Sequence, residues 1–443
     1  MKKIVFAFAL SLLPIYVFAQ SNLEIIGYFP GWKVVGAQPA TISSASINAK
    51  NLTAINYAFL DICWDGQHGN PGVTEPPDVA DCLDSSGTKI TPPNGSIVLG
   101  NPLWDTTLNG QGHDNLGKLV ALKNDNPKLK LFASVGGWNW SNRFSVTAAT
   151  QATRDNFAKS ALAFLRTYHF DGIDIDWEFP GNIGIPCTEG RICDNPNDKK
   201  NFVLLVQTLR QTLVQASLED GKRYYITIAS AASPKYIQGQ VGNENWLTAL
   251  ARSLDWINIM NYDYRSPFDA TSGLHSGLYR DKHDRIPNAK VSNGDAMVSM
   301  TLRYVPADKL VLGLAFYGYG WASCKPGPNN DGLFQPCKGG VNNTGSNFNF
   351  SDLTGQGYLH KDEQGLFTIG GLGFTRYWNE AAQAPYLYSP TSGTFISYED
   401  EQAIHAKTNY LLKKGLKGAM FWELNADKNQ TLGKVVAKDL LGR

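Results

Sequence analysis

Three carboxylates at alternate positions form the pattern in this sequence with the clearest chemical meaning. Asp174, Asp176 and Glu178 occur in the run Phe170-Asp-Gly-Ile-Asp-Ile-Asp-Trp-Glu-Phe-Pro180, where apolar residues separate them. Residues two apart in a β-strand point to the same face, so the three acids are expected together on one face. The apolar residues of the opposite face predict that this strand is buried against other elements.

Crowding these acids inside a fold is costly, because neighbouring like charges in a low dielectric cannot all be ionised. Two other interpretations are a solvated acidic strand at the edge of a sheet and a site for a hard cation such as Ca²⁺. Glu178 comes last in the run, and a glutamate that its surroundings keep protonated can act as a general acid. The pattern therefore favours acid–base catalysis, with Glu178 as the proton donor.

The rest of the chain alternates short apolar, β-branched runs with helix-like stretches, which indicates the elements that position these acids. The eight predicted strands are Glu24–Phe29, Leu52–Phe59, Lys128–Ser134, Phe170–Glu178, Tyr224–Ser230, Trp256–Met260, Leu310–Phe316 and Gly418–Trp422. The predicted helices include Thr153–Tyr168, Lys199–Gln215, Asn245–Ser253, Gly294–Tyr304 and Tyr398–Lys414. Eight strands alternating with helices predict an α/β fold, a closed parallel (β/α)₈ TIM barrel rather than an open sheet. In such barrels catalytic residues lie at the carboxyl ends of the strands, where Glu178 is placed.

Two segments interrupt this alternation. Residues 61–115, rich in Gly, Pro, Asp and Asn, are expected to form a long loop after the second strand. Residues 317–397 are too long for a loop in a compact domain, so we expect a small α+β subdomain there, between strands seven and eight, that walls the active face. The predicted organisation is a signal peptide (1–19), strands one to seven of the catalytic barrel (20–316), the insertion (317–397) and strand eight with the final helix (398–443).

The N-terminal residues predict export. Two lysines precede the apolar run 4–18, and Val17 and Ala19 place small residues before a cleavage site at Gln20, which is typical of a secretory signal peptide. The apolar run is too short for a comfortable membrane span, and no other segment is long and apolar enough. We therefore expect a secreted protein, or a periplasmic one in a Gram-negative host, without a membrane anchor.

The six cysteines agree with export. They form three local couples, which are expected to be the disulfides Cys63–Cys82, Cys187–Cys193 and Cys324–Cys337. Free thiols are the alternative, and six cysteines allow 15 connectivities. Because no Cys-x-x-Cys spacing or histidine cluster accompanies them, no metal site is expected.

The composition excludes one class of partner and suggests another. The 443 residues carry 40 basic and 39 acidic side chains, so the chain offers no basic footprint for a phosphate backbone, and nucleic acid is not an expected partner. Aromatic residues make up 12% of the chain, with 11 Trp. Besides filling a core, such a number suits a surface that stacks against flat ligands such as sugar rings.

The run Asp171-x-x-Asp174-x-Asp176-x-Glu178 resembles the signature of the family 18 glycoside hydrolases, the chitinases. Three further motifs resemble those of the same family, at strands three, six and eight: Ser134-Val-Gly-Gly-Trp138, Met260-Asn-Tyr-Asp263 and Gly418-Ala-Met-Phe-Trp422-Glu. Their order and spacing cover residues 24–443, and the insertion before strand eight resembles the chitinase insertion domain.

The resemblance implies a substrate-assisted, retaining mechanism. Glu178 would protonate the glycosidic oxygen while the acetamido carbonyl of the substrate attacks the anomeric carbon, and would then activate water against the oxazolinium intermediate. Asp176 would hold the acetamido N–H and share a proton with Asp174, and Tyr262 would donate to the acetamido oxygen. Trp422 would form the floor under the distorted sugar.

The resemblance also implies substrate contacts or supporting roles around these catalytic residues, for Tyr28, Phe59, Ser134, Gly136, Gly137, Trp138, Asn139, Phe179, Met260 and Asp263. Without the motifs, Tyr28 and Tyr262 would be interpreted as core tyrosines. Four tryptophans in or near the predicted active-face loops remain open between stacking on sugar and packing: Trp32, Trp140, Trp321 and Trp378. Asp171 has the wrong parity for the acidic face, and we expect a structural hydrogen-bonding role for it.

The function that the resemblance implies is that of a secreted chitinase. It would hydrolyse β-1,4 links between N-acetylglucosamine units in chitin and chito-oligosaccharides, as a monomer without metal or organic cofactor. One alternative is an endo-β-N-acetylglucosaminidase that acts on glycoprotein glycans with the same acetamido chemistry. The other is a chitin-binding lectin, although relatives of that kind lose the acid that Glu178 supplies here.

Overall fold

The computed structural model of the protein describes residues 23–34, 47–71, 79–181, 183–184, 195–288, 290–341 and 347–442. The predicted signal peptide (1–19) and the predicted disulfide Cys187–Cys193 lie outside these described residues. None of the helices in the described part of the chain is both long and apolar enough to span a bilayer.

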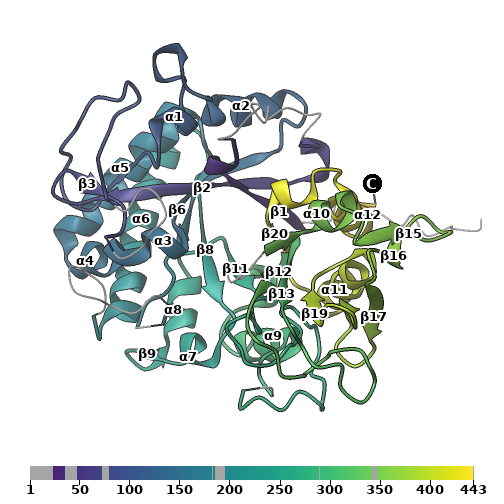
Figure 1. Ribbon diagram of the computed structural model, residues 1–443. Helices are drawn as coiled ribbons and strands as arrows, with labels where there is room; N and C mark the ends of the chain where they lie inside the picture. The colour runs from purple at the N-terminus through teal and green to yellow at the C-terminus, as the bar shows by residue number, and fades with distance from the viewer. Residues whose placement is uncertain are drawn as a thin grey trace, which may run out of the picture.

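Eight parallel strands form a closed barrel (Figure 1). They are β1 (Glu24–Pro30), β2 (Ala54–Cys63), β6 (Lys130–Gly136), β7 (Gly172–Asp176), β8 (Tyr225–Ala231), β11 (Trp256–Met260), β12 (Leu310–Ala315) and β20 (Gly418–Trp422). Each strand pairs with the next of these along the chain, and β1 pairs with both β2 and β20, which closes the cylinder. The predicted (β/α)₈ barrel is therefore confirmed.

Helices surround the barrel and follow its strands along the chain (Figure 1). The longer helices are α5 (Gln151–Tyr168), α6 (Asp198–Asp220), α9 (Gly294–Thr301), α11 (Glu401–Lys414) and α12 (Thr431–Leu441). The shorter ones are α1 (Pro102–Asp105), α2 (Asn115–Ala121), α3 (Gly137–Trp140), α4 (Phe144–Ala149), α7 (Pro234–Ile237) and α8 (Trp246–Ala251). Their ends follow local chemistry: the side chain of Thr150 caps the start of α5, and Gly221 ends α6 in the left-handed conformation. Between β1 and β2 the described chain has only the 3₁₀ turns η1 (Gly31–Val34) and η2 (Ala49–Asn51).

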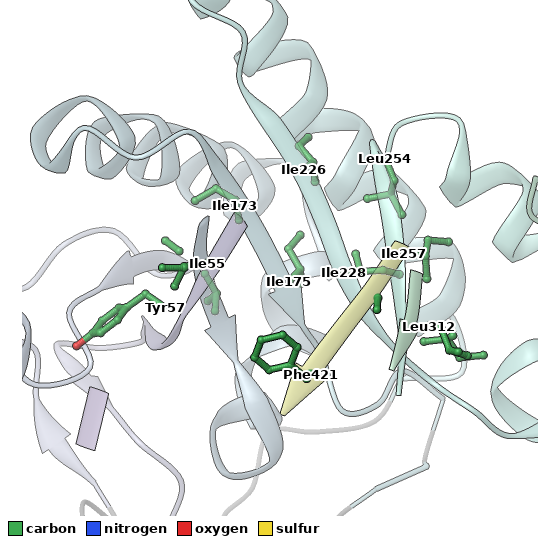
Figure 2. Close-up of a cluster of buried hydrophobic side chains, with 14 of the residues drawn as sticks. Ile55, Tyr57, Ile173, Ile175, Ile226, Ile228, Leu254, Ile257, Leu312 and Phe421 are labelled. Carbon is green, nitrogen blue, oxygen red and sulfur yellow. The ribbon is translucent and has the colours of Figure 1, made fainter. Parts of the chain in front are cut away.

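Two apolar cores lie on either side of the barrel strands. Outside the barrel, residues at alternate positions pack against the helices, and Figure 2 labels among them Ile55, Ile173, Ile175, Ile226, Ile228, Ile257 and Leu312. Inside it, residues of the opposite parity form a second cluster, which contains Ile26, Tyr28, Ala54, Ala58, Phe132, Trp256, Val311 and Met420. This partition follows the two-residue period of a strand, and it sends Asp174 and Asp176 into the interior.

The segment after strand two is more ordered than the long loop that was expected for residues 61–115. The barrel strand β2 continues to Cys63 and pairs antiparallel with β5 (Ser96–Val98), and β3 (Gln67–His68) pairs with β4 (Ala80–Asp81). The disulfide Cys63–Cys82, with an S–S distance of 2.04 Å, ties the two pairs together and confirms the predicted bond. The expectation was wrong because the partner of β5 is the extension of a barrel strand, which lies outside the segment itself.

The chain between β12 and α11 contains the expected α+β insertion. Its main sheet has the antiparallel order β14 (Asn347–Asn349), β13 (Tyr317–Trp321), β19 (Thr394–Ser397), β18 (Ala384–Ser389) and β17 (Thr375–Asn379). The helix α10 (Phe350–Gly355) and the hairpin of β15 (Leu359–Lys361) and β16 (Phe367–Gly370) complete it, and the hairpin projects from the body (Figure 1). The insertion has its own apolar cluster, and the disulfide Cys324–Cys337, also predicted, lies beside it at an S–S distance of 2.08 Å.

Candidate active site

The acidic strand β7 places its carboxylates at the carboxyl end of the barrel. Asp174 and Asp176 are 0% and 2% exposed, whereas Glu178 is half-buried and lies just beyond the end of the strand. The strand is shorter than predicted because its pairing with β8 stops at Ile175 and its pairing with β6 stops at Asp176. Glu178 therefore stands on the turn that leaves the strand, facing the mouth of the barrel.

Asp174 accepts hydrogen bonds from three hydroxyl groups inside the barrel. Tyr28 Oη donates to its Oδ2 at 2.6 Å, Ser134 Oγ to the same atom at 2.9 Å, and Thr227 Oγ1 to its Oδ1 at 2.5 Å. Tyr28 and Ser134 were expected beside Asp174. Thr227 was missed, although the register of β7 and β8 places it directly beside Asp174.

Asp176 lies next to this group and interacts with it. Tyr28 Oη is 3.3 Å from Asp176 Oδ1. Burial, followed by the charge of Asp174 and a hydrogen bond with it, raises the pKa of Asp176 well above its ordinary value. A second buried carboxylate beside it therefore disfavours the ionised form of Asp176.

Glu178 is held in its protonated form at neutral pH. Burial, followed by the negative charge of Asp263, raises the pKa of Glu178 to about 8. Its backbone N–H donates to Ser141 Oγ at 2.7 Å, and Ser141 Oγ in turn donates to the carbonyl of Asp176 at 3.0 Å. Ser141, which no sequence motif singled out, therefore fixes the turn that carries the acid. A glutamic acid with this pKa is suited to donate a proton near neutral pH.

Asp263 connects Glu178 to the inserted subdomain. It follows Tyr262 in the left-handed conformation, with φ of 59°, and its exposed carboxylate accepts a hydrogen bond from Tyr317 Oη at 2.5 Å. Tyr317 belongs to β13, the first strand of the insertion. The motif predicted Asp263, but Tyr317, which contacts it from the insertion, was missed.

The influence of Asp263 on Glu178 gives a pH prediction. Asp263→Asn removes a negative charge that disfavours ionised Glu178, so the pKa of Glu178 falls towards its ordinary value. Activity that needs the protonated acid is then lost at lower pH. We expect the basic limb of the kcat/KM profile, near pH 8 in the unaltered protein, to move to lower pH. Glu219→Gln, which changes an exposed residue near the end of α6, is the control. An unmoved basic limb in Asp263→Asn would contradict the assignment.

Tyr262 and Met260 lie at the end of β11, and Tyr262 is close enough to Asp176 and Glu178 for their charges to act on it. Both are half-buried and pack on the inner core, and Tyr262 Oη lies 3.9 Å from Met420 Sδ. Burial, followed by the charges of Asp263 and Glu178, raises the pKa of Tyr262 well above its ordinary value. The phenol therefore keeps its proton and can act as a hydrogen-bond donor.

Three half-buried aromatic side chains, Trp422, Phe59 and Trp32, form what we call the aromatic wall. The rings of Trp422 and Phe59 are stacked at 5.9 Å with an interplanar angle of 14°, and those of Phe59 and Trp32 at 5.9 Å and 28°. Trp422 also lies 5.7 Å from the ring of Tyr28, which links the wall to Asp174. The wall thus extends outward from the carboxylates, and Trp32 belongs to it.

Two glycines let the chain after β6 pass close to this site. Gly136 and Gly137 have φ of 103° and 78°, in the region that favours glycine. A Cβ on Gly136 would meet the ring of Phe144, and one on Gly137 would meet the ring of Phe59. Trp138, 50% exposed, follows them on α3, next to the exposed Asn139, whose carbonyl accepts a hydrogen bond from Asn70 Nδ2 at 2.8 Å.

The remaining predicted aromatic residues are packed in different ways. Phe179 is half-buried, and its ring meets that of Tyr236 edge-on at 5.7 Å. Trp140 and Trp321 are buried, so packing is their role. Trp378, on β17, is half-buried under the guanidinium of Arg376, which lies 5.4 Å from the ring centre.

Asp171 has the structural role that was expected. Its carboxylate pairs with Lys123 Nζ at 2.6 Å and Lys222 Nζ at 2.9 Å, and it accepts a hydrogen bond from the backbone N–H of Leu131. It ties β6 to the start of β7, at the other end of this strand from Asp176 and Glu178. Within the described ranges, no group of three or more His, Cys, Asp or Glu side chains is arranged to hold a metal ion.

Comparisons with known proteins agree on one family. The sequence model described as "Glycosyl hydrolases family 18" matches residues 24–427. Chitinase A1 from Niallia circulans is 42% identical over 97% of this chain and 60% of its own length. The solved structure of "Chitinase ChiA74 from Bacillus thuringiensis" is 40% identical, with a TM-score of 0.82 over 96% of this chain and 70% of that one. A "glycoside hydrolase family 18 N-acetylglucosaminidase from Paenibacillus barengoltzii" is 30% identical, with a TM-score of 0.69 over 94% of this chain and 100% of that one. The chain spans 60 to 65% of the length of the first curated relatives that it matches.

Proposed function

The chain belongs to the glycosyl hydrolases of family 18, and on that premise we propose that it is a secreted chitinase. It hydrolyses β-1,4 bonds between N-acetylglucosamine units in chitin and chito-oligosaccharides. The observation that carries the proposal is Glu178, whose pKa of about 8 keeps it protonated at neutral pH beside a pair of buried aspartates. The disulfides Cys63–Cys82 and Cys324–Cys337 support an oxidising compartment.

Catalysis begins with proton transfer from Glu178 to the glycosidic oxygen as the bond to the anomeric carbon breaks. The acetamido carbonyl oxygen of the sugar that contains this anomeric carbon forms the new bond to it, from the face opposite the leaving group. The product of this step is an oxazolinium ion. Glu178, now a carboxylate, takes a proton from the incoming water. The water oxygen bonds to the anomeric carbon as the oxazolinium ring opens, so the configuration is retained.

The neighbouring residues stabilise the acetamido group in this scheme. Asp176 accepts a hydrogen bond from the acetamido N–H, whose positive charge grows as the ring closes. The three hydroxyls that donate to Asp174 hold this deeper acid in place behind Asp176. Tyr262, whose raised pKa keeps its hydroxyl protonated, donates to the acetamido oxygen and aligns it for attack.

The aromatic wall supports an extended polymer rather than a single sugar. Trp422 lies under the sugar that is cleaved, and Phe59 and Trp32 continue the same aromatic surface outward. Ring faces of this kind pack well against the apolar faces of pyranose rings. The exposed Trp138 offers a further aromatic contact near the site.

Product analysis tests the proposal against its alternatives. The purified protein is incubated with chitin hexasaccharide and, separately, with a high-mannose glycoprotein. We expect short chito-oligosaccharides from the first and no released glycan from the second. Glycan release from the glycoprotein would support an endo-β-N-acetylglucosaminidase instead. Single N-acetylglucosamine units as the sole initial product would favour an N-acetylglucosaminidase, as the Paenibacillus barengoltzii relative is named. Binding without any cleavage would mean a lectin.

A further inference from the structure

A buried acid lies behind the aromatic wall and takes no part in the proposed chemistry. Asp105, the last residue of α1, is 1% exposed. It accepts hydrogen bonds from Tyr57 Oη at 2.5 Å and from the backbone N–H of Asn101 at 3.0 Å. Burial raises the pKa of Asp105 to about 7 against these hydrogen bonds, which lower it. Burying an ionisable group costs free energy, so an acid at this place calls for an explanation.

A second polar residue joins the same hydroxyl to the turn after β1. Asn115, the first residue of α2, is fully buried. Its Nδ2 donates to the carbonyl oxygen of Gly31 at 3.2 Å and to Tyr57 Oη at 3.3 Å. Among the described residues, its Oδ1 accepts no hydrogen bond. The side chain is therefore turned so that its donor group holds Tyr57 and Gly31 together.

Gly31 lies directly on this network. A Cβ at Gly31 would collide with the hydroxyl of Tyr57, and α1 packs against η1, the turn that Gly31 begins. In Figure 2 the Tyr57 ring carries its hydroxyl away from the isoleucines of the outer core. The next residue is Trp32, whose ring stacks on Phe59 and lies 6.2 Å from that of Trp422.

The same segment also touches the wall at Phe59. A Cβ at Gly100, just before α1, would collide with the carbonyl oxygen of Phe59. The segment that follows β5 therefore contacts the chain at two places on the wall. Gly100 lies directly against the carbonyl oxygen of Phe59, and Asn115 binds the carbonyl oxygen of Gly31, the residue before Trp32.

We propose that Asp105 and Asn115 are positioning residues for the aromatic wall: through Tyr57 and the carbonyl of Gly31 they fix the turn that places Trp32 beside Phe59 and Trp422. The inference rests on the proposed function and deepens it, since it assigns the segment between β5 and β6 a part in holding long substrates. Neither residue touches substrate, so the loss of either acts through Trp32 and leaves the reacting atoms in place.

A double-mutant cycle tests this directly. Asn115→Ala, Trp32→Ala and the combined variant are assayed on chitin hexasaccharide, with kcat and KM measured separately. We expect each single change to raise KM by about tenfold, which corresponds to about 1.4 kcal/mol of binding, with little change in kcat. The combined variant should be no worse than Trp32→Ala by more than about twofold, because both changes remove the same contact.

Two further variants separate positioning from general destabilisation. Gly31→Ala disturbs the same turn by placing a Cβ against the hydroxyl of Tyr57. It should reproduce the KM effect, which keeps the test decisive if Asn115→Ala fails to fold. Asn126→Ala is the matched control, because Asn126 Nδ2 likewise donates to two carbonyls, those of Ala49 and Leu52 at 2.9 and 3.0 Å. It should lower the melting temperature without raising KM.

The outcomes distinguish this inference from the proposed function. If the unaltered protein cleaves the hexasaccharide but the losses in the cycle are additive, the positioning role is overturned and the chitinase assignment stands. A KM rise in Asn126→Ala equal to that in Asn115→Ala also overturns it. If the unaltered protein neither binds nor cleaves the hexasaccharide, the proposed function fails, and this inference fails with it.

Discussion

Glu178→Gln abolishes hydrolysis of chito-oligosaccharides while leaving their binding largely intact. Glutamine has the shape of the protonated glutamic acid but no proton to give to the glycosidic oxygen. Because Glu178 is the residue whose pKa, about 8, suits proton donation at the mouth of the barrel, nothing replaces it. We expect kcat to fall by about 10³-fold or more. Reducing-sugar release measures the activity, and calorimetric titration with the hexasaccharide measures binding.

Glu401→Gln is the matched control for this experiment. Glu401 is buried, and burial raises its pKa as it does that of Glu178. It begins α11, however, and its carboxylate accepts a hydrogen bond from the backbone N–H of Phe367. The same change there should leave turnover unaltered. Turnover of Glu178→Gln within tenfold of that of the unaltered protein would contradict the assignment of Glu178 as the general acid.

Fully deacetylated chitin should be inert, because the nucleophile of the proposed reaction belongs to the substrate. An amine at the cleaved sugar has no carbonyl oxygen to attack the anomeric carbon. The protein does not replace it, since Asp174 is held by three hydroxyls inside the barrel and Asp176 faces that group. The loss of a well-oriented internal nucleophile is worth about 10³-fold or more in rate.

The measurement compares initial rates on polymers of equal length with increasing degrees of acetylation. Sequencing of the partly acetylated products should find an N-acetylated unit on the side of each cleaved bond that held the anomeric carbon. NMR of fresh products should show the β-anomer first, as retention requires. Efficient cleavage of the fully deacetylated polymer would refute substrate assistance. The protein would then be a glycosidase that works by another mechanism.

The barrel could be predicted from the sequence because its signals are local. Each strand is a short apolar run, and alternation within β7 separates Ile173 and Ile175, which pack outside, from Asp174 and Asp176, which lie inside. The roles expected for the site residues came from the resemblance of four motifs. Spacing alone favoured only a general acid at Glu178.

What the sequence could not predict depends on which strands become neighbours. Thr227 donates to Asp174 because the register pairs the two positions across β7 and β8, and no pattern within either strand contains that register. Ser141 and Tyr317 reach Glu178 and Asp263 from turns and insertions whose paths follow from tertiary packing. The partner of β5 was missed for the same reason, since it is the far end of a barrel strand.

The hydrogen bond from Tyr317 to Asp263 affects whether the insertion can be exchanged between relatives with this fold. The insertion could be exchanged freely between relatives if it made no contact with the candidate active site. Its first strand, however, supplies Tyr317 and Tyr319, whose hydroxyls hydrogen-bond Asp263, and the charge of Asp263 acts on Glu178. A chimera that carries another protein's insertion without hydroxyls at positions 317 and 319 loses these contacts to Asp263, and we expect its pH dependence to change with its insertion. A change of insertion and a change of working pH are therefore linked through the tyrosines that hold Asp263.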